Sequence, residues 1–497
     1  MSPTIIAVID VGSNSVRLLV ARSLSPSAFE VIDEERFDAR LGEGQQGGDL
    51  TPEGIERGLR AVAVMAQVAA SFSPSVTIAV GTEALRRAPN APRFIDAVRA
   101  RTGLSISVLS GSEEAFCGFL GVANSTTFRD GHLLDIGGGS LEVMRVEDRR
   151  LANVQSVPLG AIYAREKYLR GDPPAPREIR ALRKAVRQQI STVAPHPTLV
   201  ASGGAVRNLA RLIRLKRKYP LRRLHGLEVS RRELARLTAT LARLPNDERR
   251  RLPGIGANRV ETLPAAAVVI DEVMDVVGAT TLHVAGQGLR EGLVWQQLRG
   301  ESPILPDVRA ASIAGLARAN GLDERVAEPV VLAAAILFDA TADLHGLGQP
   351  EKALLLHAAR LAGIGMHIDY YNRDRHAEYL VHSGDLHGFT HREIVILAAL
   401  VRWASSGSPD LSPYGSLIQP DDPRATAILA ALLGAARAVR RRHPSPVHDL
   451  TAARKKGALV IRLSGSAPLD AEIYELERQQ RRLEAVLKVP VQLQPPG

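Results

Sequence analysis

Asp10 and Asp135 lie 125 positions apart, and each follows an apolar run and precedes glycine and small polar residues. Residues 5–15 read IIAVIDVGSNS and residues 133–140 read LLDIGGGS. An apolar run that ends in glycine predicts a buried strand entering a tight loop. Backbone N–H groups in such a loop can bind an anion, and a carboxylate at the strand end can hold a hard cation directly or through water. Each copy therefore predicts a loop for phosphate and Mg²⁺.

The repetition of this unit is more specific than either copy, because a single run of glycines is also typical of an ordinary turn. A third glycine turn, LVASGG, follows at residues 199–204, and a fourth, LHVAGQG, at residues 282–288. The spacing of the two aspartates predicts a duplicated domain whose two loops act on one ligand.

At these residues the chain resembles the exopolyphosphatase / guanosine pentaphosphate phosphatase family, which has the fold of the actin, sugar-kinase and heat-shock ATPase superfamily. The resemblance implies an α/β fold with two duplicated actin-like (ribonuclease H-like) domains around a cleft. It also implies an all-helical domain resembling an HD-type phosphohydrolase and a small C-terminal α+β unit. The expected bounds are 1–127, 128–305, 306–443 and 444–497.

Two adjacent glutamates are separated by their positions in a predicted helix. Ser110 and Glu113 have capping-box spacing, so Glu113 is expected to fold back onto the helix N-terminus. Glu114 lies about 100° further around the helix and is free to face the cleft. The resemblance also identifies the second glutamate of this pair as the catalytic base. Both arguments assign the activation of water to Glu114.

The remaining site residues rest on the loops and on the resemblance. Asp10, Asp135 and Glu142 are expected to hold Mg²⁺ or another divalent cation, with K⁺ as a further candidate. The phosphate-binding candidates have backbone N–H groups, hydroxyls, an amide or a guanidinium to offer, and they are Ser13, Asn14, Ser15, Arg86, Gly137, Gly138, Gly139, Ser140, Gly203 and Gly204. Each of these assignments has a purely structural alternative. The first loop is then a hairpin turn rich in Ser and Asn, Arg86 a solvated helix arginine and Glu142 an exposed strand glutamate.

Two positions depart from the family pattern. Gln287 stands where the family has an aspartate, and its amide carries no charge. In the helical region, Ala362-Gly363 stands where the family has a His-Asp pair. Several histidines remain nearby, but without that pair a packing or interface role is favoured over a metal site; they are His357, His367, His376, His382, His387 and His391.

The charge composition favours a polyanionic partner. Lys and Arg number 63 against 53 Asp and Glu, a net charge of +10, while aromatic residues make up only 4%. Few aromatics leave little for base stacking, so nucleic acid is not expected. Two basic triplets, Arg440–Arg442 and Arg454–Lys456, could hold a long polyanion.

Cysteine usage and hydropathy indicate the compartment. Cys117 is the single cysteine, which excludes an intrachain disulfide and fits a reducing environment. The chain opens directly into a predicted strand, and its longest clear apolar run, Ala427–Ala436, is about half a membrane span. The expectation is a cytoplasmic protein that does not enter a membrane.

The elements that position these residues follow from local patterns. Residues 4–10 and 16–21 predict a hairpin around the first loop, and Thr51-Pro52 predicts a helix start with Thr as N-cap. Residues 265–277 have amphipathic helical spacing. Near the C-terminus, strands are expected at 458–463 and 490–493 and a helix at 470–487.

The favoured function is an exopolyphosphatase that hydrolyses the terminal phosphoanhydride of inorganic polyphosphate and releases orthophosphate. Hydrolysis of guanosine pentaphosphate to tetraphosphate in the same cleft is the enzymatic alternative. A polyphosphate- or nucleotide-binding regulator with little turnover is a third hypothesis, against which Glu114 argues. A kinase is a fourth, but a glutamate poised over water fits hydrolysis better. A homodimer is expected.

Overall fold

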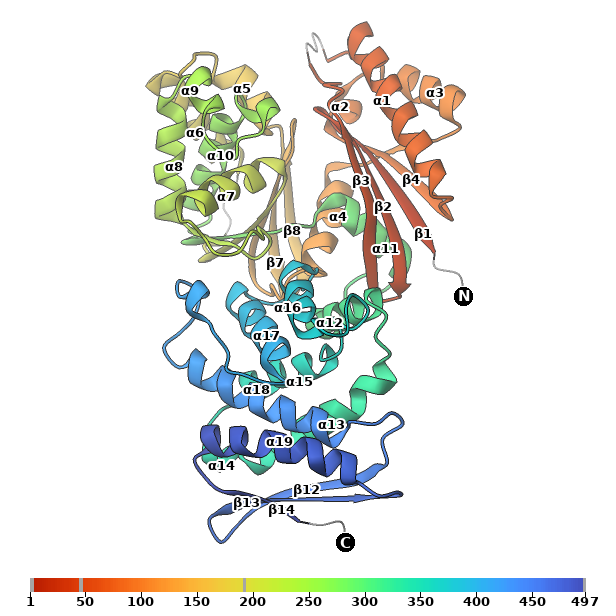
Figure 1. Cartoon of the computed structure of the whole chain (residues 1–497). Helices are drawn as coiled ribbons and strands as arrows, with labels where there is room; N and C mark the ends of the chain where they lie inside the picture. Colours follow the sequence, from red (N-terminus) through yellow and green to blue (C-terminus); the bar gives the residue numbers. More distant parts are fainter. Residues whose placement is uncertain (1–3, 44–47, 191–193, 495–497) are drawn as a thin grey trace. The chain divides into compact units, whose positions relative to one another are not determined.

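The computed structural model describes residues 4–43, 48–190 and 194–494 (Figure 1). Its contacts divide the chain into two compact units, Met1–Val308 and Arg309–Gly497. The first unit is α/β and the second is mainly helical, which confirms the expected fold class. The likeness of the helical part to HD-type phosphohydrolases and the four predicted domain bounds stay predictions.

The first sheet has five strands in the order β3-β2-β1-β4-β5. They are β1 (Ile5–Val11), β2 (Val16–Ser25), β3 (Ala28–Phe37), β4 (Val76–Gly81) and β5 (Ile106–Val108). The first three strands are antiparallel neighbours, whereas β4 and β5 continue parallel to β1. Helix α1 (Pro52–Ser71) begins as predicted, because Thr51 Oγ1 accepts a hydrogen bond from Gly54 N at 3.0 Å.

The second sheet repeats this topology in the order β8-β7-β6-β9-β11, with β10 added at the edge. Its strands are β6 (Gly131–Ile136), β7 (Leu141–Glu147), β8 (Arg150–Val157), β9 (Thr198–Ser202), β10 (Glu228–Ser230) and β11 (Thr281–Val284). The two hairpins also share their register, since Asp10 pairs with Arg17 and Asp135 pairs with Glu142. The duplication predicted from the two loops is therefore present in the backbone.

Helices connect and cover the strands of the first unit (Figure 1). Besides α1, they are α2 (Glu83–Arg87), α3 (Ala91–Thr102), α4 (Gly111–Ala123), α5 (Ala161–Tyr168), α6 (Pro176–Gln189), α7 (Gly204–Lys216), α8 (Arg231–Arg243), α9 (Asn246–Arg250), α10 (Leu263–Val276) and α11 (Leu289–Arg299). Helices α4 and α11 approach each other closely, because a Cβ atom at Gly292 would come within 1.8 Å of Cys117 O.

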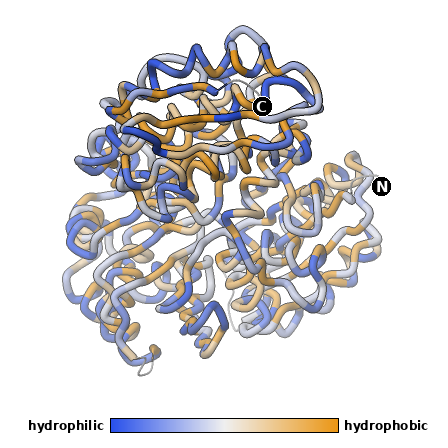
Figure 2. Tube along the Cα trace, turned by 90° about the horizontal axis from the view of Figure 1, so that it is seen from below, coloured by the Kyte–Doolittle hydropathy of each residue, from blue (hydrophilic) through white to orange (hydrophobic). Residues whose placement is uncertain are grey.

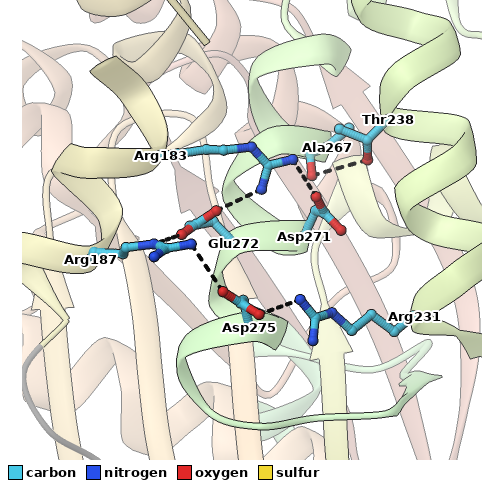
Figure 3. A network of polar contacts seen from close by, with 8 residues as sticks. All are labelled: Arg183, Arg187, Arg231, Thr238, Ala267, Asp271, Glu272 and Asp275. Carbon is cyan, nitrogen blue, oxygen red and sulfur yellow. Dashed lines mark hydrogen bonds and ion pairs between the residues drawn. The ribbon is translucent and has the colours of Figure 1, made fainter. Parts of the chain in front are cut away.

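The helix predicted at residues 265–277 is present as α10, but it is buried along nearly its whole length, the polar position Glu272 included. Two of its acidic residues, Asp271 and Glu272, are buried as well, and the Glu272 side chain has no exposed surface, whereas the Asp275 side chain is 36% exposed. Figure 3 shows how arginines from neighbouring helices neutralise them. Arg183 of α6 contacts Asp271 and Glu272, and Arg187 bridges Glu272 and Asp275. These pairs allow charged residues to occupy a core position.

The second unit packs helices and a small sheet around a single hydrophobic core. Its elements are α12 (Val308–Ala319), α13 (Glu324–Ala340), α14 (Ala342–His345), α15 (Gln349–Arg360), α16 (Arg373–Ser383), α17 (His391–Trp403), α18 (Asp422–Val439), β12 (Val447–Lys455), β13 (Ala458–Gly465), α19 (Asp470–Leu487) and β14 (Val491–Gln494). Figure 2 shows hydrophobic and hydrophilic stretches alternating along the strands near the C-terminus. Strand β12 was not predicted, because its exposed polar residues carry little hydrophobic signal.

The basic triplets are largely used inside this unit. Arg442 forms two hydrogen bonds of 2.8 Å with Glu472, whose side chain is buried, and Arg454 contacts Asp343 at 3.2 Å. Within the described residues, Lys455 and Lys456 form no ion pair. A contact of these lysines with long polyphosphate stays a prediction.

The histidines of the helical region have separate partners. His382 Nε2 lies 3.1 Å from the Tyr414 hydroxyl, His357 packs edge-on against Phe389, and His367 contacts a backbone carbonyl. Among the residues that the structure describes, no three His, Cys, Asp or Glu side chains converge as a ready metal site. No helix in the described part of the chain combines the length and apolar character needed to cross a bilayer.

Candidate active site

A cavity of about 120 Å³ opens between the loop ends of the two sheets in the first unit. It is lined by every residue predicted for the site except Arg86. The lining therefore combines the two glycine loops, the loop after β9, and the carboxylates of Asp10, Glu114, Asp135 and Glu142. The structure brings together groups that are far apart in the sequence, while their chemical roles stay predictions.

The two phosphate-type loops have the same closing hydrogen bond. Gly12 N donates to Ser15 O at 3.2 Å, and Gly137 N donates to Ser140 O at 3.1 Å. The loops face each other closely, because a Cβ atom on Gly139 would lie 3.0 Å from Ser13 Oγ. Any side chain at Gly139 would fill the space into which the loop N–H groups and hydroxyls project.

Gly203 completes this arrangement from the end of β9. Its φ of +105° is one that L residues rarely adopt, and a Cβ atom there would come within 2.5 Å of Ile136 O. Glycine at this position therefore lets the third loop pass directly behind the Asp135 loop.

The capping box that separates the two glutamates is confirmed. Ser110 Oγ accepts from Glu113 N at 3.2 Å, and Ser110 N donates to Glu113 Oε2 at 2.8 Å. Glu114, one residue further along α4, has its side chain 15% exposed at the cavity. The adjacent glutamates thus have different positions, as the spacing predicted.

Arg86 contacts Glu114 and does not line the cavity. Its Nη1 donates to Glu114 Oε2 at 3.0 Å and to Leu109 O at 2.7 Å, and its Nη2 donates to Glu83 Oε2 at 2.7 Å. Among the described residues, Glu114 Oε1 has no hydrogen-bond partner. Arg86 therefore holds one carboxylate oxygen and leaves the other for a ligand or water; direct phosphate binding by Arg86 stays a prediction.

The four carboxylates affect one another's protonation. The pKa of Glu114 is raised to about 7, chiefly by burial; Arg86 opposes this shift, and the nearby charges of Asp10 and Asp135 add to it. Burial, then the charges of Glu114 and Asp135, raise the pKa of Glu142 well above its ordinary value. Burial also raises the pKa values of Asp10 and Asp135. Negative charge has accumulated here in excess of what neighbouring groups neutralise.

This donor set fits Mg²⁺, which binds oxygen ligands and usually keeps several waters. Asp10, Asp135 and Glu142 provide only carboxylate oxygens, and a cation would relieve their mutual repulsion. Because the described residues hold no closed set of three such ligands, a metal here would need water and substrate oxygens to complete its shell. Gln287 does not line the cavity; its Oε1 accepts from Trp295 Nε1 at 3.3 Å.

Four arginines that the sequence analysis did not assign to the site also line the cavity: Arg17, Arg207, Arg259 and Arg290. Burial and, next, the charge of Arg290 lower the pKa of Arg17 to about 10. Burial and, next, the charge of Arg17 lower the pKa of Arg259 to about 10. Clustered cations of this kind are stabilised by a bound anion with several negative charges.

One signal could have identified Arg17 from the sequence. Arg17 follows Asp10 by the same number of residues as Glu142 follows Asp135. Arg17 and Glu142 therefore occupy equivalent positions in the repeat. Arg207 follows Gly203-Gly204 in the first turn of α7, where the glycine turn could have suggested it. No local pattern indicates Arg259, which reaches the cavity from the segment between α9 and α10.

Cys117 has no part in this chemistry. It lies buried on α4, and burial raises the pKa of its thiol to about 12. A buried thiol of this kind is typical of an inert packing residue.

Two duplicated sheets that enclose a cavity of carboxylates, glycine loops and arginines define a phosphate-handling α/β protein. The sequence matches the Ppx/GppA phosphatase family over residues 19–301 and domain III of the Ppx/GppA phosphatases over residues 308–469. The first match spans more than half of the chain, and the protein therefore belongs to the Ppx/GppA phosphatase family.

Solved structures agree with this assignment over the first unit. The Ppx/GppA family member from Aquifex aeolicus is 27% identical, with a TM-score of 0.53; the match covers 59% of this chain and 96% of that one. An exopolyphosphatase from Cytophaga hutchinsonii is 22% identical, with a TM-score of 0.56; the match covers 60% and 98% of the two chains. The second comparison supports the fold alone.

Proposed function

We propose that this protein is an exopolyphosphatase that removes the terminal phosphate of inorganic polyphosphate. The observation that carries the proposal is the position of Glu114, whose Oε1 faces a cavity built from two phosphate loops. A general base works best when its pKa lies near the working pH, and burial raises the pKa of Glu114 to about 7. The exopolyphosphatase structure from Cytophaga hutchinsonii has the same fold.

The proposed reaction is an in-line displacement by water. The water gives a proton to Glu114 Oε1 as its oxygen bonds to the terminal phosphorus, and the bridging oxygen departs with the shortened chain. Arg86 keeps the carboxylate oriented through Oε2. The loop N–H groups and Ser13 offset the charge of the transferring phosphoryl group, which is the main source of catalysis in phosphoryl transfer.

Asp10, Asp135 and Glu142 would hold Mg²⁺ or another divalent cation. When bound, the cation would supply charge neutralisation at the phosphate oxygens. Arg17, Arg207, Arg259 and Arg290 also line this cavity, and each guanidinium can bind phosphate oxygens. Several such groups support a substrate with linked phosphates, such as polyphosphate, over a phosphomonoester.

A second candidate is guanosine pentaphosphate, and one observation favours it. A hollow of about 340 Å³ shares Ser13, Glu83 and the Gly138-Gly139 loop with the catalytic cavity and also exposes Tyr163. An aromatic ring in that place could stack on a nucleobase while the phosphates lie in the cavity. Under this alternative Tyr163→Ala impairs nucleotide hydrolysis and leaves polyphosphate hydrolysis unchanged.

The deciding experiment measures phosphate release from long polyphosphate and from guanosine pentaphosphate in parallel, with Mg²⁺ and with excess chelator. We expect faster release from polyphosphate and loss of activity in chelator. Asp135→Asn should lower activity and weaken the Mg²⁺ dependence together. Full activity in chelator would exclude the metal role, and release from guanosine pentaphosphate alone would replace the favoured substrate with the alternative.

A further inference from the structure

We propose that the second unit contains a separate binding site for a phosphorylated small molecule. A cavity of about 470 Å³ lies among α13, α15, α18 and α19, entirely within Arg309–Gly497. Its volume is in the range of small-molecule sites. The proposal does not depend on the activity of the cleft in the first unit.

The charge of this cavity is strongly positive. Two carboxylates, Asp323 and Glu475, line it together with six arginines, which leaves an excess of four positive charges; the arginines are Arg360, Arg373, Arg437, Arg440, Arg441 and Arg478. The excess is gathered around one open cavity, with Arg437 buried and Arg441 and Arg478 exposed at its edge. Such a lining attracts a ligand with several negative charges.

The arginines are only loosely neutralised by the protein. Arg437 lies 3.7 Å from Asp374 and Arg441 lies 3.8 Å from Glu475, both beyond hydrogen-bond distance. Glu475 is shared with Arg478, which approaches it at 3.3 Å. Burial lowers the pKa of Arg437; the charge of Asp374 opposes this shift, and the charges of Arg373 and Arg441 add to it. A bound anion would supply the missing neutralisation.

Two buried polar atoms in the lining also have no partner among the described residues: Arg440 Nε and Gln479 Oε1. Buried polar groups are normally hydrogen-bonded, because leaving one unpaired is costly. Both residues line the cavity, so this part of its wall has hydrogen-bonding capacity that the described residues do not use.

Part of the cavity lining is apolar or aromatic. Val326, Val330 and Met366 line it, as does Tyr370, whose ring stacks under the Arg373 guanidinium at 4.7 Å. This part would pack against an organic part of the ligand, while the arginines bind its phosphates. The ligand class is therefore a phosphorylated organic molecule rather than inorganic phosphate alone.

The place of this cavity is also informative. Ala362 and Gly363 line it, at the position where the family resemblance predicts a His-Asp metal pair. Neither residue has a side chain that could bind a metal, and the arginines that share the lining suit an anion.

The test follows hydrogen exchange in the full-length protein as ADP or pyrophosphate is added. We expect ADP to protect residues 359–373 and 434–441, with a lower midpoint concentration than pyrophosphate. Because the midpoint is measured in these segments, binding in the cleft of the first unit does not affect it. No protection there would overturn the proposal, and equal midpoints would overturn the assignment of an organic part.

The matched variants use exposed arginines, so that folding is preserved. Arg441 and Arg478 have side chains 56% and 62% exposed, and replacing both with alanine should raise the ADP midpoint about tenfold or more. Arg481 lies on α19, the helix of Arg478, but outside the cavity lining. Arg481→Ala should therefore leave the ADP midpoint unchanged within about twofold. Equal effects of the two changes would mean that the arginines act only through general surface charge.

Discussion

At the scale of single residues, the adjacent glutamates Glu113 and Glu114 have different contacts, and we expect them to have different functions. Glu113 is bound to the N-terminus of its own helix, whereas Glu114 presents one oxygen to the cavity. We expect Glu114→Gln to reduce kcat by about 10²–10⁴-fold, the effect of losing a general base, with little change in substrate binding.

The matched control for this prediction is Glu113→Gln, measured by phosphate release and by thermal unfolding. It should lower the melting temperature slightly through the cap and leave kcat nearly unchanged. If Glu113→Gln abolished turnover while Glu114→Gln did not, the two roles would be reversed.

Arg86 should set the pH range in which Glu114 is active. The base must be deprotonated, so activity is lost as pH falls through the pKa of Glu114, about 7 in this structure. Arg86 favours the charged carboxylate, and Arg86→Gln should therefore move the acidic limb of kcat/KM to higher pH. Arg87→Gln is the control, because Arg87 contacts Glu83 and not Glu114. If the acidic limb of kcat/KM stayed at the same pH in Arg86→Gln, the contact between Arg86 and Glu114 would not control the pH dependence.

At the scale of elements, the buried charges of α10 show how a helix with acidic residues can lie inside the core. Glu272 is paired with Arg183 and Arg187 of α6 (Figure 3). Glu272→Ala would leave both arginines without this partner and should cost about 3–5 kcal/mol of unfolding free energy. Asp275→Ala, at a position 36% exposed, should cost clearly less in the same denaturant titration. Equal losses of unfolding free energy in the two variants would show that burial does not determine how much each ion pair contributes.

At the scale of the whole molecule, the two compact units have separate hydrophobic cores. We expect calorimetry to resolve two unfolding transitions, since cooperativity follows the core. Glu272→Ala should lower one transition, and Arg442→Ala, which leaves the buried Glu472 side chain unpaired, should lower the other. A single transition lowered by both changes would show that the units unfold together.

The sequence alone determined the features that depend on neighbouring residues along the chain. The Asp-x-Gly loops, the Thr51 cap and the Ser110 capping box all follow from short-range hydrogen bonds and from the conformational freedom of glycine. The repeat with Asp10 and Asp135 also predicted the two sheets, because equal patterns form equal local structures. These local signals identified most of the residues that line the cavity.

Only the tertiary structure decided which distant charges meet. Arg259 reaches the cavity, Arg86 binds Glu114, and the arginines of the second unit surround Ala362 and Gly363. Helix α10 has amphipathic spacing, yet arginines from α6 allow its acidic residues Asp271 and Glu272 to be buried as well. In each case the energy depends on desolvation and on pairing between residues far apart in the chain, and neither quantity is encoded in local spacing.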